Sequence, residues 1–301
     1  MSLNNFSIII PVYNEANILR KSIVSLIKDL EKITQFRNNY EIIIIENGST
    51  DFTRQVATQL AKEFSLVRIN HLEYSSYGEA LKLGIGSSTY EKVIIFNVDF
   101  WDLDFLRKTL PLLDIYDCIV GSKVIAGSVD KRPLLRRLIT RWFNLLLRLL
   151  YGFRGTDTHG IKGLRKSAIY PIVTQCLTER EIFDTELLLR ADRNALSIHE
   201  LPVLIREVRL PRLNPLKRIP STIRDLLKLY VALQFRPTIK LNTPHYRHHN
   251  VEGRDFSSSY QKVKLLLGKF ADEEISFILE LPINTIKELS EMIRSEDEDK
   301  P

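Results

Sequence analysis

Residues Lys92–Asp102 read KVIIFNVDFWD, and this stretch decides how the first part of the chain is expected to fold. Its apolar run, VIIF, suits a buried strand. Asn97, Asp99 and Asp102 follow that run among two aromatic rings. Two interpretations are open: the strand stops at a solvated turn, or its carboxyl end delivers carboxylates to a bound ion or sugar.

The same pattern recurs on both sides of this stretch. Helix-like segments separate the apolar runs, which lie at residues 6–10, 41–46, 65–70, 92–97 and 117–122. Apolar strands that alternate with helices are typical of a parallel sheet covered by helices on both faces. Ligands bind beyond the carboxyl ends of such strands. The polar clusters PVYNE, ENGSTD, NVDFWD and GSK all follow apolar runs, so we expect the site there.

The composition excludes several classes of protein. Hydrophobic residues make up 44% of the 301 residues, which is enough for a large core and too much for a disordered chain. The net charge of +6 favours anionic partners such as nucleotides or phospholipid surfaces. Cys118 and Cys176 belong to no CxxC pair, which argues against a zinc site.

The sequence also gives an expectation about location. No segment offers about 18 consecutive apolar residues, so we predict no transmembrane helix. The first residues, MSLNNFSIII, lack the basic start and long apolar stretch of a signal peptide. We therefore expect a cytoplasmic protein, peripheral on the cytoplasmic face of a membrane.

After Gly127 the strand and helix alternation stops. We expect one domain over residues 1–236 that includes basic amphipathic helices, a linker over 237–255, and a small helical appendage with an acidic tail over 256–301. Residues 155–169 look like a loop. The appendage has no basic flanks, which argues against nucleic-acid binding. It is expected to dock or to form a homo-oligomer.

Six motifs together resemble those of family 2 glycosyltransferases. IIIPVYNEANIL, EIIIIENGSTDFT, YGEALKLGI, VIIFNVDFWD, CIVGSK and FDTELLLRA occur in that family's order and spacing across Ser7–Leu210. They are most similar to the dolichyl- or polyprenyl-phosphate sugar synthases. This resemblance implies an α/β fold of the GT-A type, a nucleotide-sugar donor, a divalent cation (Mg²⁺ or Mn²⁺) and inversion at the anomeric carbon.

The resemblance assigns the PVYNE motif to the nucleotide. Pro11 closes the first strand, because proline cannot donate to a ladder hydrogen bond. Tyr13 can stack on a base, and Asn14 and Glu15 can hydrogen-bond to a base or a ribose. The alternative is an ordinary helix start with Asn14 as its cap.

The ENGSTD motif stands where relatives usually carry DDGS. Glu46 keeps a carboxylate, one methylene longer, and is expected to contact the base. Asn47 keeps an amide but loses the charge, and Gly48 provides the turn beside the nucleotide. The alternative is a simple strand-to-helix turn, which Gly48 would make in any case.

The family pattern at the fourth strand is Asp-any-Asp, whereas this chain has Asn97-Val98-Asp99. Mg²⁺ is often held by one or two carboxylates with substrate phosphates and waters. We therefore expect Asp99 to hold the cation on the donor diphosphate and to serve catalysis, with Asn97 and Val98 beside the nucleotide. The site would be weakened but present; the alternative is a turn that binds no ion.

The acceptor side is predicted from basic residues. Lys123 stands where relatives often have an arginine that meets phosphate, although lysine cannot make the bidentate contact. Residues 133–151 form a basic amphipathic helix suited to a membrane interface. Arg136 and Thr140 lie one turn apart and are expected to face one phosphate pocket. The alternatives are a solvated lysine and a helix with its arginines in water.

Three further positions concern catalysis. Asp184, or Glu186 beside it, could take a proton from a hydroxyl acceptor, whereas a phosphate acceptor is already anionic and needs no base. Arg206 is expected to stabilise the departing diphosphate. Asp157 matches the acceptor loop of the relatives, and His159 replaces a small hydroxyl residue there.

The sequence therefore predicts an inverting glycosyltransferase that moves a hexose from a UDP- or GDP-linked donor to polyprenyl or dolichyl phosphate at a membrane surface. One alternative is transfer to a sugar or polysaccharide hydroxyl, with Asp184 as base. Another is a degenerate relative that binds a nucleotide or a partner without turnover, which Asn47 and Asn97 would explain.

Overall fold

The computed structural model describes residues 5–33, 36, 38–130, 132–180, 182–205, 219–235 and 256–298. Its main sheet has the order β3-β2-β1-β4-β7-β5-β8. The strands are β1 (Phe6–Val12), β2 (Tyr40–Asn47), β3 (Val67–Leu72), β4 (Lys92–Ile95), β5 (Cys118–Ser122), β7 (Lys162–Arg165) and β8 (Ile198–Pro202). A small second sheet pairs β6 (Val129–Asp130) with β9 (Leu204–Ile205).

The strands expected from the apolar runs are present and pair in parallel. β1 pairs in parallel with β2 and β4, β2 with β3, and β5 with β8. β1 continues through Pro11 to Val12 instead of closing at the proline. The expected mostly parallel sheet is confirmed.

The expectation of a loop over residues 155–169 is wrong. This segment contains β7, which lies antiparallel between β4 and β5. The strand has only four residues, and Gly163 interrupts any alternation of apolar and polar side chains. Its pairing partners are distant in sequence, and a Cβ at Gly163 would collide with Thr109 of a helix on the sheet. Only tertiary contacts define this strand.

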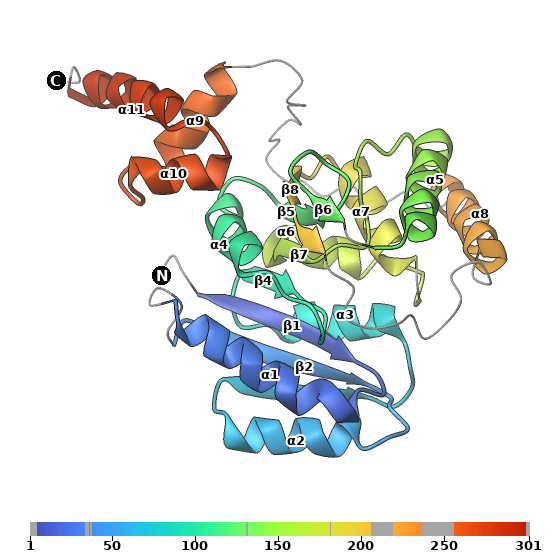
Figure 1. Cartoon of the computed structure of the whole chain (residues 1–301). Helices are drawn as coiled ribbons and strands as arrows, with labels where there is room; N and C mark the ends of the chain where they lie inside the picture. Colours follow the sequence, from blue (N-terminus) through green and yellow to red (C-terminus); the bar gives the residue numbers. More distant parts are fainter. Residues whose placement is uncertain are drawn as a thin grey trace.

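Helices cover both faces of the sheet (Figure 1). Residues of β2 alternate between the two cores: Ile42 and Ile44 face one, and Ile43 and Ile45 face the other. The first core lies under α1 (Ala16–Glu31), α2 (Thr53–Glu63) and α4 (Leu103–Leu112). The second lies under α3 (Tyr77–Ser87), α5 (Leu134–Tyr151), α6 (Lys166–Val173), α7 (Phe183–Arg193) and α8 (Ile219–Phe235).

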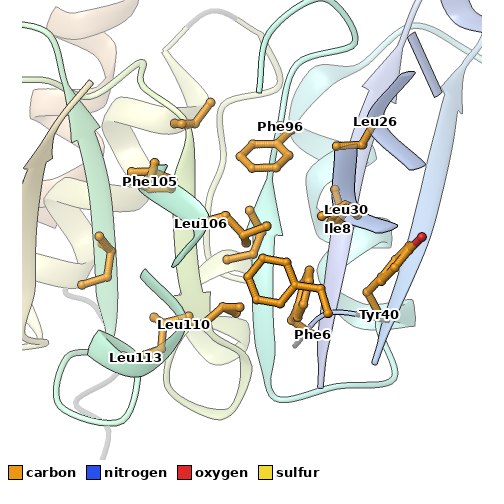
Figure 2. Close-up of a cluster of buried hydrophobic side chains, with 14 of the residues drawn as sticks. Phe6, Ile8, Leu26, Leu30, Tyr40, Phe96, Phe105, Leu106, Leu110 and Leu113 are labelled. Carbon is orange, nitrogen blue, oxygen red and sulfur yellow. The ribbon is translucent and has the colours of Figure 1, made fainter. Parts of the chain in front are cut away.

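Large apolar side chains pack α1 and α4 against the face of the sheet that forms the first core. Figure 2 shows Phe6 and Phe96 between the strands and the helical residues Leu26 and Leu106. All four are almost fully buried. Burial of one such side chain contributes about 1.5–3 kcal/mol. This packing fixes the strand ends, and hence the loops that follow them, in rigid positions.

The last three described helices are α9 (Phe256–Leu266), α10 (Asp272–Leu279) and α11 (Ile283–Glu298), and they pack beside α4 (Figure 1). Phe277 of α10 lies under the cationic groups of Arg107 and Lys108, at 5.2 and 4.8 Å from the ring centroid. Lys108 also pairs with Glu280. The helical appendage is confirmed. The linker over 237–255 lies outside the described residues, so the domain boundaries stay a prediction. No described helix is both long enough and apolar enough to cross a bilayer.

Candidate active site

Two loops at the carboxyl ends of β1 and β2 are tied together by hydrogen bonds. The backbone N–H of Asn14 donates to Ser49 Oγ at 3.0 Å, and Asn14 Oδ1 accepts from the Thr50 N–H at 2.8 Å. The N–H of Glu15 donates to Thr53 Oγ1 at 2.8 Å. Asn14 has a positive φ of 53° and does not cap α1. The PVYNE motif therefore belongs to two loops that hydrogen bonds hold together, and it is more than the start of a helix.

The nucleotide-side residues lie at this loop pair, but they differ in accessibility. Tyr13 is 40% exposed, so a base could reach its ring. Glu15 and Pro11 are partly buried beside it. Gly48 has a φ of +65°, and a Cβ there would lie 2.6 Å from the carbonyl carbon of Tyr74. Only glycine allows this close approach between the loop after β2 and the segment of Tyr74 that follows β3.

The side chains of Glu46 and Asn47 form hydrogen bonds with other groups of the protein. Glu46 is 2% exposed, and its Oε1 accepts from the Ser49 N–H at 2.6 Å. Its Oε2 lies 3.3 Å from Nδ1 of His71 on β3. Asn47 Oδ1 accepts from the Ser76 N–H at 2.7 Å, which fixes the start of α3. Sequence reasoning missed His71, because only the pairing of β2 with β3 brings it to Glu46.

The stretch after β4 forms a tight turn. Asn97 and Phe100 exchange backbone hydrogen bonds at 3.2 and 3.3 Å, so Val98 and Asp99 occupy the tip. Asn97 and Asp99 are exposed, whereas Val98 is buried in the core. Asp102 accepts from the Phe105 N–H at 2.9 Å and caps α4, so it is a helix cap.

The residues of this turn fit a cation that arrives with its ligand better than a resident ion. Among the residues that the structure describes, no group of three or more His, Cys, Asp or Glu side chains could hold a metal. Asp99 provides a carboxylate and Asn97 an amide oxygen on the same turn. That oxygen-donor set suits Mg²⁺ or Mn²⁺ only if phosphate oxygens and waters complete the shell.

Lys123 lies at the end of β5 and is not a solvated lysine. Its side chain is 9% exposed, and its Nζ lies 3.2 Å from Oδ2 of the buried Asp157. Burial lowers the pKa of Lys123, although the charge of Asp157 opposes this shift. The lysine is thus a partly desolvated cation, and such a cation interacts strongly with an incoming anion.

Arg132 is the second cation of this region, and sequence reasoning did not single it out. Its Nε and Nη2 donate to both oxygens of Asp130 at 2.9 and 2.7 Å. Burial raises the pKa of Asp130, but the hydrogen bonds and charge of Arg132 outweigh this and lower it. Arg132 Nη2 also donates to Thr140 Oγ1 at 3.3 Å, and Thr140 donates to the carbonyl of Arg136 at 3.0 Å. The structure thus places the Arg132 guanidinium beside Thr140, whereas Arg136 contacts Thr140 through its backbone carbonyl.

Asp184 lies at the start of α7 between two partners. Lys162 Nζ lies 3.1 Å from its Oδ1, and Tyr77 Oη donates to its Oδ2 at 3.2 Å. Lys162 is 1% exposed and also donates to the Gly160 carbonyl at 2.8 Å. Burial and the charge of Asp184 raise the pKa of Tyr77 well above its ordinary value, so Tyr77 remains a hydrogen-bond donor.

Glu186 has a structural role. Its carboxylate accepts from the N–H groups of Leu177 and Thr178 at 2.9 and 2.7 Å and from Arg190 Nε at 2.7 Å. It is fully buried, so it could not reach an acceptor hydroxyl. His159, in contrast, is exposed, with Nδ1 2.9 Å from Thr158 Oγ1.

The strand register places Lys162 and Asp184 in the middle of the candidate site. Lys162 pairs with Ile95 of β4 and with Val120 of β5. The turn of Asp99 follows β4, and Lys123 follows β5. The candidate donor and acceptor positions therefore lie on either side of the strand that carries Lys162. Arg206 lies outside the described residues.

Residues 7–173 of the 301 match the family model described as Glycosyl transferase family 2. The chain belongs to this family. The match takes in the loops after β1, β2, β4 and β5, and hence most of the candidate site.

Curated relatives of this family 2 glycosyltransferase are identical to it at about a quarter of the aligned positions. Glycosyltransferase AglD of Haloferax volcanii is 25% identical over 238 residues, which cover 77% of this chain but 38% of AglD. The chain thus spans less than half the length of that relative. Dolichyl-phosphate beta-glucosyltransferase of Saccharomyces cerevisiae is 28% identical over 234 residues, which cover 67% of each chain.

The fold is shared with a solved structure. Glucosyl-3-phosphoglycerate synthase from Mycobacterium tuberculosis, in complex with Mn²⁺, UDP-glucose and phosphoglyceric acid, superposes with a TM-score of 0.53. The two chains are 17% identical, and the match covers 81% of this chain and 84% of the other. At this identity the likeness concerns the fold, and the expected GT-A fold is confirmed.

Proposed function

We propose that this family 2 glycosyltransferase transfers a hexose, with inversion, from a nucleotide-diphosphate sugar to the phosphate of a polyprenyl or dolichyl carrier. Family membership supports the transferase chemistry, and the name of the yeast relative supports a lipid-phosphate acceptor. The observation that carries the acceptor assignment is the position of two partly buried cations, Lys123 and Arg132, near an exposed apolar helix face.

That apolar face is formed by α5 and α8, which lie side by side (Figure 1). Tyr151 of α5 donates to the Leu226 carbonyl of α8 at 2.5 Å and packs edge-on against Tyr230. Exposed apolar side chains on the two helices are Leu134, Leu135, Leu138, Trp142, Leu145, Leu149, Ile219, Ile223, Leu227 and Val231. Exposed basic residues, such as Arg141 and Arg148, flank them. Such a face supports binding in the interfacial region of an anionic membrane.

A lipid phosphate held at this face would lie close to the cations. Lys123 is paired with Asp157, and Arg132 is paired with Asp130. An arriving phosphate would compete with these carboxylates for the two cations, and it would accept from the Thr140 hydroxyl in place of the Arg136 carbonyl. Arginine can offer a bidentate contact to phosphate, which Lys123 cannot. We therefore assign the acceptor phosphate to Lys123, Arg132, Arg136 and Thr140.

On the donor side, Tyr13 would stack on the base, and the loops of Pro11, Glu15 and Gly48 would enclose the nucleotide. Asp99 would hold a divalent cation on the diphosphate, with Asn97 and the Val98 backbone beside it. When bound, the cation neutralises charge on the departing diphosphate. This assignment uses the single carboxylate that the turn offers.

An anionic acceptor requires no general base, and the surroundings of Asp184 agree with this. A proton on Asp184 would leave the ammonium of Lys162 buried without a counter-charge, which is costly. This pair therefore weighs against a hydroxyl acceptor with Asp184 as base. In our proposal Asp184 supports the site and does not move a proton.

The proposal can be tested by incubating the protein with radiolabelled UDP-glucose or GDP-mannose, Mn²⁺ and dolichyl phosphate in phospholipid vesicles. We expect label to enter the organic-extractable lipid, and we expect Arg132→Ala to reduce this transfer strongly. A matched control is Arg20→Ala, which removes an exposed arginine paired with Glu63 on α2. Turnover only with sugar hydroxyl acceptors, or no turnover at all, would contradict the proposal.

A further inference from the structure

The buried carboxylate of Glu46 has no free oxygen for a nucleobase. Its Oε1 is 2.6 Å from the Ser49 N–H, and its Oε2 is 3.3 Å from His71 Nδ1. The carboxylate is also 2% exposed. A group in this position orients its neighbours and is closed to an incoming ligand. The side chain of His71, which contacts Glu46 Oε2, is more accessible, at 24% exposed.

The strand register shows where His71 lies relative to the loop that follows β1. Val12, Glu46 and His71 form one row across the carboxyl ends of β1, β2 and β3, because Val12 pairs with Glu46 and Glu46 with His71. Side chains in register on neighbouring strands share a face of the sheet. Tyr13, the exposed ring of the nucleotide loop, follows directly after Val12. The row thus connects Val12, the residue before Tyr13, with His71.

We propose that His71 reads the nucleobase and that Glu46 fixes the tautomer in which it does so. An ionised carboxylate only accepts hydrogen bonds, so it selects the imidazole with a proton on Nδ1. In neutral histidine, Nε2 is then an acceptor. Within the described part of the chain, no hydrogen bond reaches His71 Nε2.

This arrangement selects one chemical class of base. An acceptor nitrogen matches a base that presents a ring N–H, as uracil does at N3 and guanine at N1. Cytosine and adenine present an acceptor nitrogen at the corresponding position. Its lone pair would face the lone pair of His71 Nε2, and no hydrogen bond would form. The inference rests on the proposed use of a nucleotide donor and makes it more specific.

The test is calorimetric binding of UDP, GDP, CDP and ADP, each with Mn²⁺ and without sugar or acceptor. All four ligands carry the same diphosphate, so differences report the base. We expect UDP and GDP to bind roughly tenfold or more tightly than CDP and ADP, because a site built for one hydrogen-bond polarity rejects the other. His71→Phe should remove this preference.

Glu46→Gln provides a sharper test. The Ser49 N–H requires an acceptor, so the amide oxygen of the new side chain would face Ser49 and its NH₂ group would face His71. His71 Nδ1 would then accept, and Nε2 would carry the proton. We expect this variant to favour CDP over UDP. A matched control is His199→Phe on β8, at the opposite edge of the sheet, which should leave the preference unchanged.

The outcomes separate this inference from the proposed function. If the protein binds the nucleotides without base preference, or if His71→Phe and Glu46→Gln keep the preference of the wild type, His71 does not read the base. The transferase proposal would survive those results. If the preference follows our expectation but no sugar is transferred to dolichyl phosphate, the base assignment stands and the proposed function fails. Failure to bind any of the four nucleotides would overturn both.

Discussion

The ion pair of Lys162 and Asp184 provides a quantitative test of whether Asp184 supports the site or moves a proton. At 3.1 Å and an effective dielectric constant of about 20, two unit charges attract each other by about 5 kcal/mol. Desolvation of the two ions offsets much of this attraction, since Lys162 is 1% exposed. The intact pair therefore adds little net stability, but loss of one partner exposes the whole desolvation cost of the other.

We expect Asp184→Asn to lower the free energy of unfolding by about 3–5 kcal/mol, because the buried ammonium of Lys162 would lose its counter-charge and keep only neutral acceptors such as the Gly160 carbonyl. Lys162→Met should cost a similar amount, since it leaves Asp184 with the Tyr77 hydroxyl alone. The double variant should recover most of the loss. Urea unfolding followed by circular dichroism would give all four free energies and hence the coupling energy.

A matched control is the pair of Lys82 and Glu79, which lies at 2.8 Å on the surface of α3. Lys82→Met should cost no more than about 1 kcal/mol, because both side chains of this pair stay in partial contact with water and such a pair contributes little. If the losses of Lys162→Met and Asp184→Asn simply add in the double variant, the pair is not coupled and our reasoning is wrong.

The same double variant tests the chemistry. With polyprenyl phosphate as acceptor, we expect its rate to stay within about tenfold of the wild type once folding is intact. A general base contributes about 10²- to 10⁴-fold. A fall of that size in a folded double variant would assign proton transfer to Asp184 and favour a hydroxyl acceptor.

Three further changes test other parts of the molecule. Asp99→Asn should weaken Mn²⁺-dependent UDP binding at least about tenfold while metal-free binding changes little, as calorimetry would show; equal metal dependence would exclude Asp99 as the ligand. Gly48→Ala should lower the free energy of unfolding by about 1–3 kcal/mol, because the φ of Gly48 is +65° and the new Cβ would meet Tyr74. Denaturant unfolding would measure this loss, and a free energy equal to that of the wild type would argue against the strain. The lowered pKa of Asp130 gives stability that is fully present above its unfolded value of about 3.9 and is lost as pH falls through the folded pKa. Asp130→Asn should therefore reduce stability at neutral pH and flatten the acid limb of the stability curve, and an unchanged acid limb would contradict the assignment.

The sequence by itself determined the parallel core and the edge of the sheet at which we place the candidate site. Apolar runs such as EIIIIE can be buried on both faces only between two layers of helices, so local composition was sufficient. The polar residues that follow these runs, including Asp99 and Lys123, must then lie at the carboxyl ends of strands. The resemblance to the family added the transferase chemistry, and four of its six motifs contain the residues that follow these strands.

Only the tertiary structure decided which polar groups meet. β7 was not predicted, because a strand of four residues that includes a glycine shows no periodic pattern of apolar side chains. Its position between β4 and β5 depends on long-range pairing, and its residue Lys162 forms the ion pair with Asp184. The pairing of β2 with β3 brings His71 to Glu46 from 25 positions away in the sequence. Such contacts depend on strand register and long-range packing, which residue types and local spacing do not encode.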